Sequence, residues 1–330
     1  MRIGVFGAGG WGTAFARLLA ICEHDTVLWA RDPKQAVAIA TDRCNNKYLP
    51  NVELPLDRLR VTADLSEAAQ QDVLVFAVPS FGMTDLLQRV APVSDSSPIV
   101  VNLAKGIDRA TKKTMSELIL RSIPGSNVFT LSGPSHAEEV GKDIPTAAVL
   151  AGRDLELGKR LQEEIATPRF RVYLSEDIRG VELCATVKNV IALATGISDG
   201  LGYGDNSRGA LITRGLAEMV RFGRTFGVRD VTFFGLAGLG DLVATCTSQH
   251  SRNRSVGCRL GRGESVEHIL EEMDMVAEGV YATTIIHEIA GERGIEMPIT
   301  EAVYRLLQGE ADPLSLVEQI MTRAPKREEI

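Results

Sequence analysis

Lys188 lies in a segment where a charged side chain is unexpected. From Val181 to Thr195 the chain contains neither Gly nor Pro, and at about 100° per residue almost every face of the helix that it predicts is apolar. Glu182, Thr186 and Asn189 share one narrow polar stripe, and Lys188 lies more than a quarter turn away from it. A lysine in such surroundings is a candidate general acid or base.

The alternative is that Lys188 lies along an apolar surface with its ammonium in water, as most lysines on helices do. Fully buried lysines are rare. The neighbours on its face, Cys184, Ala185 and Ala192, are small and leave room beside the ammonium. Both interpretations stay open on this segment alone.

Gly7, Gly9 and Gly12 form the pattern GxGxxG directly after a predicted strand at 2–6, where a predicted helix begins. In such a loop the first glycine permits a tight turn, the second lets a pyrophosphate approach the backbone, and the third packs helix on strand. The amides at the helix start then face the phosphates. In this context we predict a dinucleotide-binding loop rather than a purely structural turn.

Arg31 and Asp32 follow the second predicted strand, at 26–30, where the cofactor's ribose is read. An arginine at this place favours a 2′-phosphate and hence NADP(H), whereas an acidic residue binds the 2′-hydroxyl of NAD(H). The sequence therefore predicts NADP(H) and leaves NAD(H) open. An ordinary solvated loop is the remaining alternative.

A second polar cluster follows three glycines in "FGLAGLGDLVATCTSQHSRNR" (234–254). Asp241 opens a helical segment and could orient a lysine or bind a hydroxyl. Ser251 is placed like an N-cap, with Arg252 and Asn253 in the first turn of the next helix. Arginine grips phosphate through two parallel hydrogen bonds, and a helix start adds amide donors. A capped helix with exposed arginines is the alternative.

Lys105, Gly133 and Ser135 follow two other predicted strands at their carboxyl ends. Ligands of open α/β sheets bind at that edge. Together with the basic helix start, these residues predict a small phosphorylated substrate beside a nicotinamide.

The predicted elements change in kind near residue 178. Before it, continuous apolar strands alternate with amphipathic helices, which is typical of a parallel sheet buried on both faces. The strands are predicted at 2–6, 26–30, 72–78, 98–104, 127–132, 146–152 and 170–175, and helices at 12–22, 82–90, 114–122 and 154–166. After it, only helices are predicted, at 180–196, 208–226, 264–272, 278–292, 298–308 and 313–323. We expect an α/β fold with a Rossmann-type doubly wound sheet as a dinucleotide-binding domain (1–178), followed by an all-α substrate and catalytic domain (179–330).

Composition narrows the class of protein. The chain has 330 residues, 45% of them hydrophobic, and a net charge of −7, which does not indicate a nucleic-acid surface. No signal peptide and no apolar run of membrane length are expected. The five cysteines show no metal or disulfide spacing, so we expect reduced thiols, no metal site and a cytoplasmic protein.

These motifs closely resemble the bacterial type of NAD(P)-dependent glycerol-3-phosphate dehydrogenase over nearly the whole chain. The resemblance rests on "GAGGWGTAFA", "NLAKGI", "SGPSHAEEV", "CATVKNVIALATGI", "GYGDNSRGALITRGLAEM", "FGLAGLGDLVATCTSQHSRNR", "AEGVYAT" and "MPITEAVYRLL". The C-terminal motifs are the specific ones, because a generic dinucleotide-binding enzyme has no reason to carry them. A homodimer is compatible with the resemblance.

The resemblance implies reversible reduction of dihydroxyacetone phosphate to sn-glycerol 3-phosphate for phospholipid synthesis, with Lys188 as the catalytic proton donor and acceptor. It implies substrate contacts from Lys105, Gly133, Ser135, Lys188, Asp241, Ser251, Arg252 and Asn253. It implies cofactor contacts from Gly10, Trp11, Arg31, Lys105, Ala137, Arg252, Val276 and Glu278, beside the loop glycines Gly7, Gly9 and Gly12. Asn189, Thr245, Tyr48 and Phe81 resemble supporting residues. Gly10 replaces a serine of many relatives, which removes a hydroxyl but keeps the backbone amide.

Two other functions compete with this one. Dehydrogenases of 3-hydroxyacids or 6-phosphogluconate share the two-domain plan and a lysine on the junction helix. A non-catalytic NADP(H) sensor would need only the first domain. The sensor gives no reason for Lys188, Asp241 and Arg252 to occur together.

Overall fold

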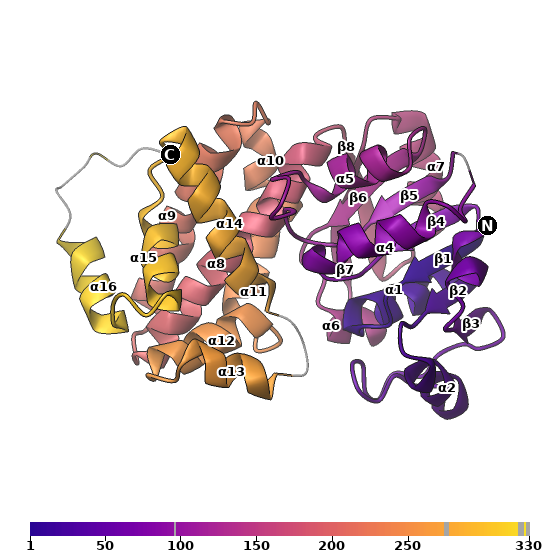
Figure 1. Ribbon diagram of the computed structural model, residues 1–330, viewed down its shortest axis with the longest axis horizontal. Coiled ribbons are helices and arrows are strands. Elements are labelled where there is room, and N and C mark those ends of the chain that lie inside the picture. Colours follow the sequence, from indigo (N-terminus) through magenta and orange to yellow (C-terminus); the bar gives the residue numbers. More distant parts are fainter. Residues whose placement is uncertain (96, 274–276, 323–326, 328–330) are drawn as a thin grey trace. The chain divides into compact units, whose positions relative to one another are not determined.

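The chain folds into two compact units, residues 1–179 and residues 180–330 (Figure 1). The computed structural model describes residues 1–95, 97–273, 277–322 and 327. Each unit has its own architecture, the first built on a sheet and the second on helices.

An eight-stranded sheet forms the centre of the first unit. Its strands are β1 (Arg2–Phe6), β2 (Asp25–Trp29), β3 (Leu59–Thr62), β4 (Val73–Phe76), β5 (Ile99–Asn102), β6 (Asn127–Ser132), β7 (Thr146–Gly152) and β8 (Phe170–Ser175). Their spatial order is β3-β2-β1-β4-β5-β6-β7-β8. Neighbours are parallel except for β6 and β7, which are antiparallel. The order reverses between β1 and β4, which is where a doubly wound sheet opens a crevice for a ligand.

Helices cover both faces of this sheet. They are α1 (Gly10–Ile21), α2 (Pro33–Asp42), α3 (Leu65–Ala69), the 3₁₀ turn η1 (Ser80–Gly82), α4 (Met83–Val90), α5 (Met115–Ser122), α6 (Ala137–Gly141) and α7 (Leu155–Ile165). One core contains residues of α1 and α7, and the other contains residues of α3, α4 and α5. Successive strand residues point to opposite cores, so the strands are apolar on both sides.

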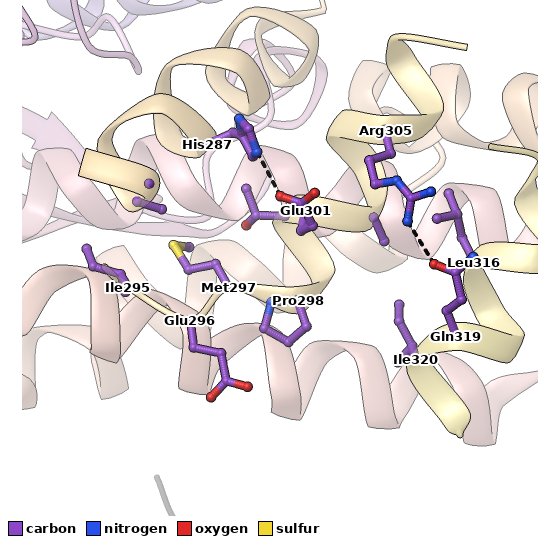
Figure 2. Close-up of a pocket in the computed structure, with 14 residues that line it drawn as sticks. His287, Ile295, Glu296, Met297, Pro298, Glu301, Arg305, Leu316, Gln319 and Ile320 are labelled. Atoms are coloured by element: carbon purple, nitrogen blue, oxygen red, sulfur yellow. Dashed lines mark hydrogen bonds and ion pairs between the residues drawn. The ribbon is translucent and has the colours of Figure 1, made fainter. Parts of the chain in front are cut away.

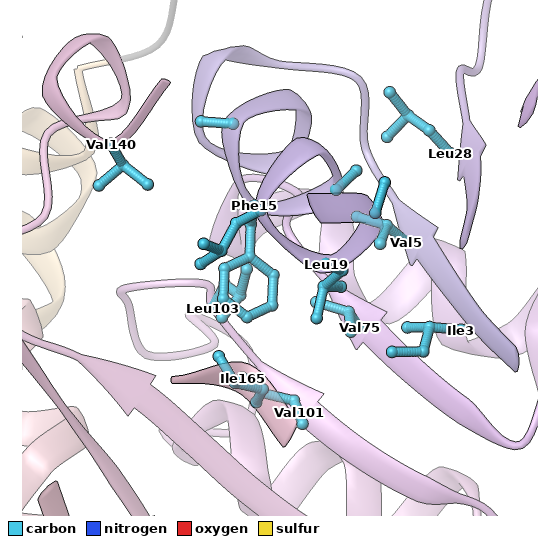
Figure 3. Close-up of a cluster of buried hydrophobic side chains, with 14 of the residues drawn as sticks. Ile3, Val5, Phe15, Leu19, Leu28, Val75, Val101, Leu103, Val140 and Ile165 are labelled. Atoms are coloured by element: carbon cyan, nitrogen blue, oxygen red, sulfur yellow. The ribbon is translucent and has the colours of Figure 1, made fainter. Parts of the chain in front are cut away.

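The core beneath α1 shows this alternation directly (Figure 3). Ile3 and Val5 of β1 lie with Val75 and Val101 of the neighbouring strands, under the helix that carries Phe15. The intervening residues of these strands pack into the opposite core. Burial of both faces fixes α1 on the sheet, and with it the glycine loop that precedes the helix.

In its described residues, the second unit consists of helices joined by turns and loops, with no strand. Its helices are α8 (Ile178–Gly200, of which the first two residues belong to the first unit), α9 (Asp205–Arg224), α10 (Asp230–Phe234), the π turn η2 (Leu236–Gly240), α11 (Asp241–Thr247), α12 (Arg252–Gly261), α13 (Val266–Glu272), α14 (Glu278–Arg293), α15 (Pro298–Leu307) and α16 (Pro313–Met321).

Helix α8 is the core helix of this unit, with every residue from Gly180 to Ser198 buried. Glu182, Thr186 and Asn189, expected as a polar edge, are therefore buried too, because other helices surround α8. By length and composition α8 could cross a membrane, which the sequence did not lead us to expect. Its apolar window is wholly buried inside the structure, as in the core helix of a soluble protein, so it is weak evidence for a membrane span.

The predicted fold class is confirmed, with two differences in the sheet. The strand β3 was not predicted, because the short sequence "LRVT" at the sheet edge is only partly buried and shows no apolar run. The helices α2 and α3 on either side of it were not predicted either. The expectation of a wholly parallel sheet is wrong at β7, which runs opposite to β6.

Glu218 is a buried carboxylate that caps a helix from a neighbouring one. It lies on α9, is 1% exposed, and accepts hydrogen bonds from the backbone N–H of Ile299 (2.5 Å) and of Thr300 (3.2 Å) at the start of α15. The hydroxyl of Thr300 donates a third bond at 3.0 Å. Burial outweighs these bonds and raises the pKa of Glu218 to about 7.

We expect stability to depend on pH through Glu218. Because the folded protein binds this proton more tightly than the unfolded chain, the stabilisation is complete below pH 4.5, the ordinary pKa, and is lost as pH rises through about 7. The loss amounts to roughly 3 kcal/mol. Urea unfolding of Glu218→Gln across this window should show that the pH-dependent part has disappeared, whereas Glu267→Gln, at an exposed position of α13, should keep it. Equal slopes for wild type and Glu218→Gln would contradict the assignment.

Candidate active site

The glycine loop follows β1 and has a different physical requirement at each glycine. Gly7 has φ +115°, and a Cβ there would lie 2.7 Å from the carbonyl oxygen of Ala77, at the end of β4. A Cβ at Gly12 would lie 1.9 Å from the oxygen of Gly7, so the helix packs against the strand without a side chain between them. A Cβ at Gly9 would meet nothing within 4 Å, which leaves the backbone open to a ligand. The loop therefore fits a pyrophosphate at the switch point of the sheet.

Two amide side chains brace this loop, and neither was predicted from the sequence. Gln35 and Asn45 both donate to the carbonyl oxygen of Ala8, at 2.7 and 2.9 Å. Asn45 also donates to the hydroxyl of Thr13, at 2.8 Å. No motif marks an asparagine that reaches back over 37 residues, so only the structure could reveal it.

Arg31 and Asp32, which follow β2, differ in exposure and in hydrogen bonding. Arg31 is exposed beyond the end of β2. The Asp32 side chain caps α2 by accepting from the backbone N–H of Lys34 at 2.9 Å. A carboxylate that is engaged as a helix cap is less available to a ribose hydroxyl, so the arrangement favours an anionic group near Arg31.

Lys105, Gly133 and Ser135 are brought together at the carboxyl ends of β5 and β6. The Lys105 ammonium donates to the carbonyl oxygen of Gly133 at 3.4 Å, and the Ser135 hydroxyl donates to the same oxygen at 3.0 Å. Gly133 has φ +147°, and a Cβ there would lie 3.0 Å from the backbone of Ala148, on β7. This corner combines a cation and a hydroxyl, as a phosphorylated or hydroxylated ligand requires.

The start of α1 also contacts α6. A Cβ at Gly10 would lie 3.5 Å from the Cβ of Ala137 and 2.9 Å from the carbonyl oxygen of Tyr48. A serine at this position would therefore need the Tyr48 backbone to move. Among the described residues, the buried indole Nε1 of Trp11 has no hydrogen-bond partner within the chain. Phe81, in η1 after β4, is 53% exposed.

In the second unit, the Lys188 ammonium is held in a buried ion pair. Its Nζ lies 2.5 Å from Oδ1 of Asp241 and donates to Oγ1 of Thr245 at 2.7 Å. Both charged side chains are nearly inaccessible, at 5% and 3% exposure. Lys188 thus does not extend along a surface into water. A buried ammonium bound to a carboxylate and a hydroxyl has a fixed direction, as proton transfer to a bound oxygen requires.

Asp241 and Thr245 lie one turn apart on α11. The Thr245 hydroxyl donates to the backbone carbonyl of Asp241 at 2.6 Å, which leaves its lone pairs for Lys188. On the same helix, burial raises the pKa of the Cys246 thiol to about 12, so it stays neutral. The carboxylate of Asp241 is accordingly the anionic partner that the structure pairs with Lys188.

The start of α12 carries the "SRN" motif. Ser251 is the N-cap, and its hydroxyl accepts from the backbone N–H of Arg254 at 3.2 Å, as the sequence suggested. Arg252 is the first residue of the helix and is exposed. An exposed guanidinium at a helix start, where amide N–H groups are unsatisfied by the helix itself, forms a site for an anion only together with other groups.

Asn253 is buried and joins three helices. Its Nδ2 donates to Oδ1 of Asn189 on α8 at 2.9 Å, and its Oδ1 accepts from the backbone N–H of Gly279 on α14 at 2.9 Å. Glu278 is the first residue of α14. Val276, expected beside the cofactor, lies outside the described residues.

Helices α8 and α12 cross in direct backbone contact at four glycines, two on each helix. A Cβ at Gly196 would lie 2.1 Å from the carbonyl oxygen of Arg254, and one at Gly257 would lie 2.2 Å from that of Leu193. Gly200 and Gly261, four residues later on each helix, have contacts of 2.2 and 2.3 Å. This GxxxG spacing on both helices is visible in the sequence and is the local signal that marks such a close crossing. It fixes the "SRN" motif relative to the Lys188 helix.

A groove of about 440 Å³ lies elsewhere in the second unit, among α14, α15 and α16. Figure 2 shows His287 and Glu301 directed toward each other inside it, and their Nε2 and Oε2 atoms are 2.7 Å apart. None of the candidate residues lines this groove, so we do not place the active site there. Among the described residues, no group of three or more His, Cys, Asp or Glu side chains could hold a metal ion.

Two family models match the chain. The model described as the N-terminus of NAD-dependent glycerol-3-phosphate dehydrogenase matches residues 2–158, and the model of its C-terminus matches residues 177–318.

Proteins similar to this chain in sequence and in structure are also described as glycerol-3-phosphate dehydrogenases. The chain is 47% identical to a glycerol-3-phosphate dehydrogenase [NAD(P)+] of Chlorobium limicola and 46% identical to one of a Thermoanaerobacter species, with 99% of each chain covered in both comparisons. The crystal structure of glycerol-3-phosphate dehydrogenase from Coxiella burnetii is similar with a TM-score of 0.94 at 39% identity, covering 98% of this chain and 99% of that one. D-mandelate dehydrogenase, at 14% identity and a TM-score of 0.66, shares only the fold.

Proposed function

Because the chain belongs to the NAD-dependent glycerol-3-phosphate dehydrogenase family, we propose that it reversibly reduces dihydroxyacetone phosphate to sn-glycerol 3-phosphate with NAD(P)H. This reaction supplies glycerol 3-phosphate for glycerophospholipid synthesis. The observation that supports it most directly is the buried ion pair of Lys188 and Asp241, 2.5 Å apart.

Lys188 is the proton donor for the ketone oxygen and the proton acceptor in the reverse direction. When bound, the nicotinamide cofactor supplies hydride to the carbonyl carbon and accepts it during oxidation. N–H groups of the Lys188 ammonium are directed to Asp241 and Thr245, which fixes the orientation of the ammonium. Asp241 holds the ammonium in place through the 2.5 Å contact and stabilises its positive charge.

Arg252 binds the substrate phosphate. Its guanidinium offers two parallel hydrogen bonds, and the N-terminal amides of α12 add partial positive charge beside it. Ser251 and Asn253 contribute by fixing this helix start, through the N-cap and through the bond to Asn189. Lys105, Gly133 and Ser135, which lie together at the carboxyl ends of β5 and β6, also bind the substrate.

Residues 1–178 are the dinucleotide-binding domain, and residues 179–330 are the substrate and catalytic domain. The open backbone at Gly9 and the amides at Gly10 and Trp11 support binding of the cofactor's pyrophosphate. Ala137 and Glu278 are further residues that bind the cofactor. The protein acts in the cytoplasm, where its five free cysteines stay reduced, and a homodimer is compatible with this function.

A spectrophotometric assay tests the function. NADPH and then NADH oxidation is followed with dihydroxyacetone phosphate and with 3-oxoacids, and NADP+ and NAD+ reduction is followed with 6-phosphogluconate. We expect turnover with dihydroxyacetone phosphate alone. Turnover with another substrate class would overturn the assignment, and cofactor binding without turnover would favour a sensor.

Arg31 should govern the choice of cofactor. Because it follows β2, where the ribose is read, Arg31→Ala should weaken NADPH binding more than NADH binding, by about 1–3 kcal/mol. Fluorescence titration of both cofactors measures the difference, with Arg58→Ala as a control, since Arg58 is paired with Asp25 on another part of the unit. Equal losses for the two cofactors would show that Arg31 contacts something other than the 2′-phosphate.

A further inference from the structure

We infer that the π turn η2 positions Asp241 against Lys188, and that Gly238 is the residue on which this positioning depends. The inference rests on the proposed function only in that Lys188 is taken as the proton donor. The structural part of it concerns the ion pair itself.

The turn that precedes Asp241 is wider than an α-helical turn. The backbone N–H of Gly240 donates to the carbonyl oxygen of Gly235 at 3.1 Å, a hydrogen bond that spans five residues instead of four. The N–H of Asp241 itself is directed to the carbonyl oxygens of Leu236 and Gly238. Such turns are rare and occur frequently at functional sites, because the extra residue changes the direction in which the following side chains point.

Gly238 is pressed against the backbone of Phe233, on α10. A Cβ at Gly238 would lie 2.2 Å from the carbonyl oxygen of Phe233 and 2.5 Å from its Cα. Phe233 cannot give way, because it is fully buried and its ring fills the space beside another glycine. A Cβ at that glycine, Gly223 of α9, would lie 2.1 Å from Cζ of Phe233. The position of the π turn is thus fixed by two close contacts. Gly238 of the turn packs against the backbone of Phe233, and the ring of Phe233 packs against Gly223.

Asp241 follows this turn directly and is the first residue of α11. A shift at Gly238 would move both oxygens that Lys188 contacts, because Thr245 lies one turn further on the same helix. The Nζ contacts are short, at 2.5 Å to Asp241 and 2.7 Å to Thr245, so a displacement of about 1 Å breaks them. The guanidinium of Arg254 is bound to Asp199 at 2.7 Å, and Asp199 also binds Arg208, so these charges form a group separate from the Lys188–Asp241 pair.

Gly238→Ala is the direct test, and Gly235→Ala is its matched control. Both add one methyl group beside the same turn, but a Cβ at Gly235 would come no closer than 3.5 Å to another atom, with φ −87°. We expect Gly238→Ala to lower kcat in both directions by about 10- to 100-fold, while the Kd for NADPH stays within twofold. Gly235→Ala should keep the wild-type kcat.

A double-mutant cycle separates positioning from a general loss of structure. If Gly238 acts through Asp241, Gly238→Ala should have almost no further effect on kcat in an Asp241→Asn background. An equal loss in both backgrounds, or a lower Tm with unchanged kcat, would overturn the inference. If Gly238→Ala does not fold, Phe233→Leu removes the aromatic ring without adding an atom and enters the same cycle.

The ¹⁵N resonance of the Lys188 ammonium gives a measurement that does not need turnover. The resonance is assigned to Lys188 because it is missing from the spectrum of Lys188→Met. Its chemical shift should change in Gly238→Ala and stay unchanged in Gly235→Ala. An unshifted resonance in both variants would overturn the inference even if the enzyme is active. A wild-type enzyme that does not reduce dihydroxyacetone phosphate would overturn the proposed function alone, since the resonance would still report on the ion pair.

Discussion

Lys188→Met should lower turnover by about 10²–10⁴-fold in both directions, the usual contribution of a positioned acid or base. The methionine keeps the length of the side chain and removes the ammonium. The Kd for NADPH should change little. Turnover in each direction and a cofactor titration measure the two effects, and Lys159→Met, at an exposed position of α7, is the control that should stay active. A methionine variant with a near wild-type rate would show that another group or water supplies the proton.

The stability of this variant needs its own control, because the ion pair is buried. Removing Lys188 leaves the carboxylate of Asp241 without its ammonium, and breaking a buried pair on one side costs about 3–5 kcal/mol. The double variant Lys188→Met/Asp241→Asn removes both charges and should recover most of that stability. Activity should not return with it. Lys188→Arg should also stay inactive, because a guanidinium remains protonated near neutrality.

Arg252→Ala should raise the KM for dihydroxyacetone phosphate. A charge-assisted phosphate contact is worth about 2–4 kcal/mol, which corresponds to roughly 30- to 700-fold. Arg252→Lys should recover only part of the loss, since lysine has no planar fork. Steady-state kinetics at saturating NADPH measures both.

Arg262 provides the matched control for this prediction. It is exposed just beyond the C-terminal end of α12, so Arg262→Ala changes the net charge by the same amount at the other end of the same helix. Its KM should match that of the wild type. Equal effects of the two substitutions would indicate a long-range effect of charge, and no effect of Arg252→Ala would place the phosphate elsewhere.

Local patterns were sufficient to identify the elements that carry the chemistry. Lys188 stood out because its position conflicts with the polar stripe of its own helix, and Ser251 was recognisable as an N-cap from the residues beside it. The glycine loop could be interpreted because strand, turn and helix follow one another within 12 residues. Each of these signals depends on neighbours in the sequence.

Relations between distant segments could not be predicted in the same way. Lys188 and Asp241 are 53 residues apart, and only the packing of α8 against α11 makes them partners. The direction of β7 leaves no mark in its apolar pattern. Once the structure is known, the length of α6, between β6 and β7, explains why β7 is antiparallel. A helix of five residues rises only about 7.5 Å. A strand of six residues spans about 20 Å, so α6 is too short to return the chain to the other end of the sheet.

The crossing of α8 and α12 limits the substitutions that can raise the thermal stability of this protein. Replacing a helical glycine by alanine ordinarily raises stability by about 0.4–1 kcal/mol, because the unfolded chain loses conformational freedom. At Gly196, Gly200, Gly257 and Gly261 that route is closed, since the first added carbon would meet a backbone atom of the other helix at 2.1–2.3 Å. Exposed helical positions such as Gly209 and Gly291 have open space around a Cβ and allow the exchange. Stabilising glycine-to-alanine substitutions can therefore be made at exposed positions such as Gly209 of α9 and Gly291 of α14, whereas α8 and α12 must keep the glycines at their crossing.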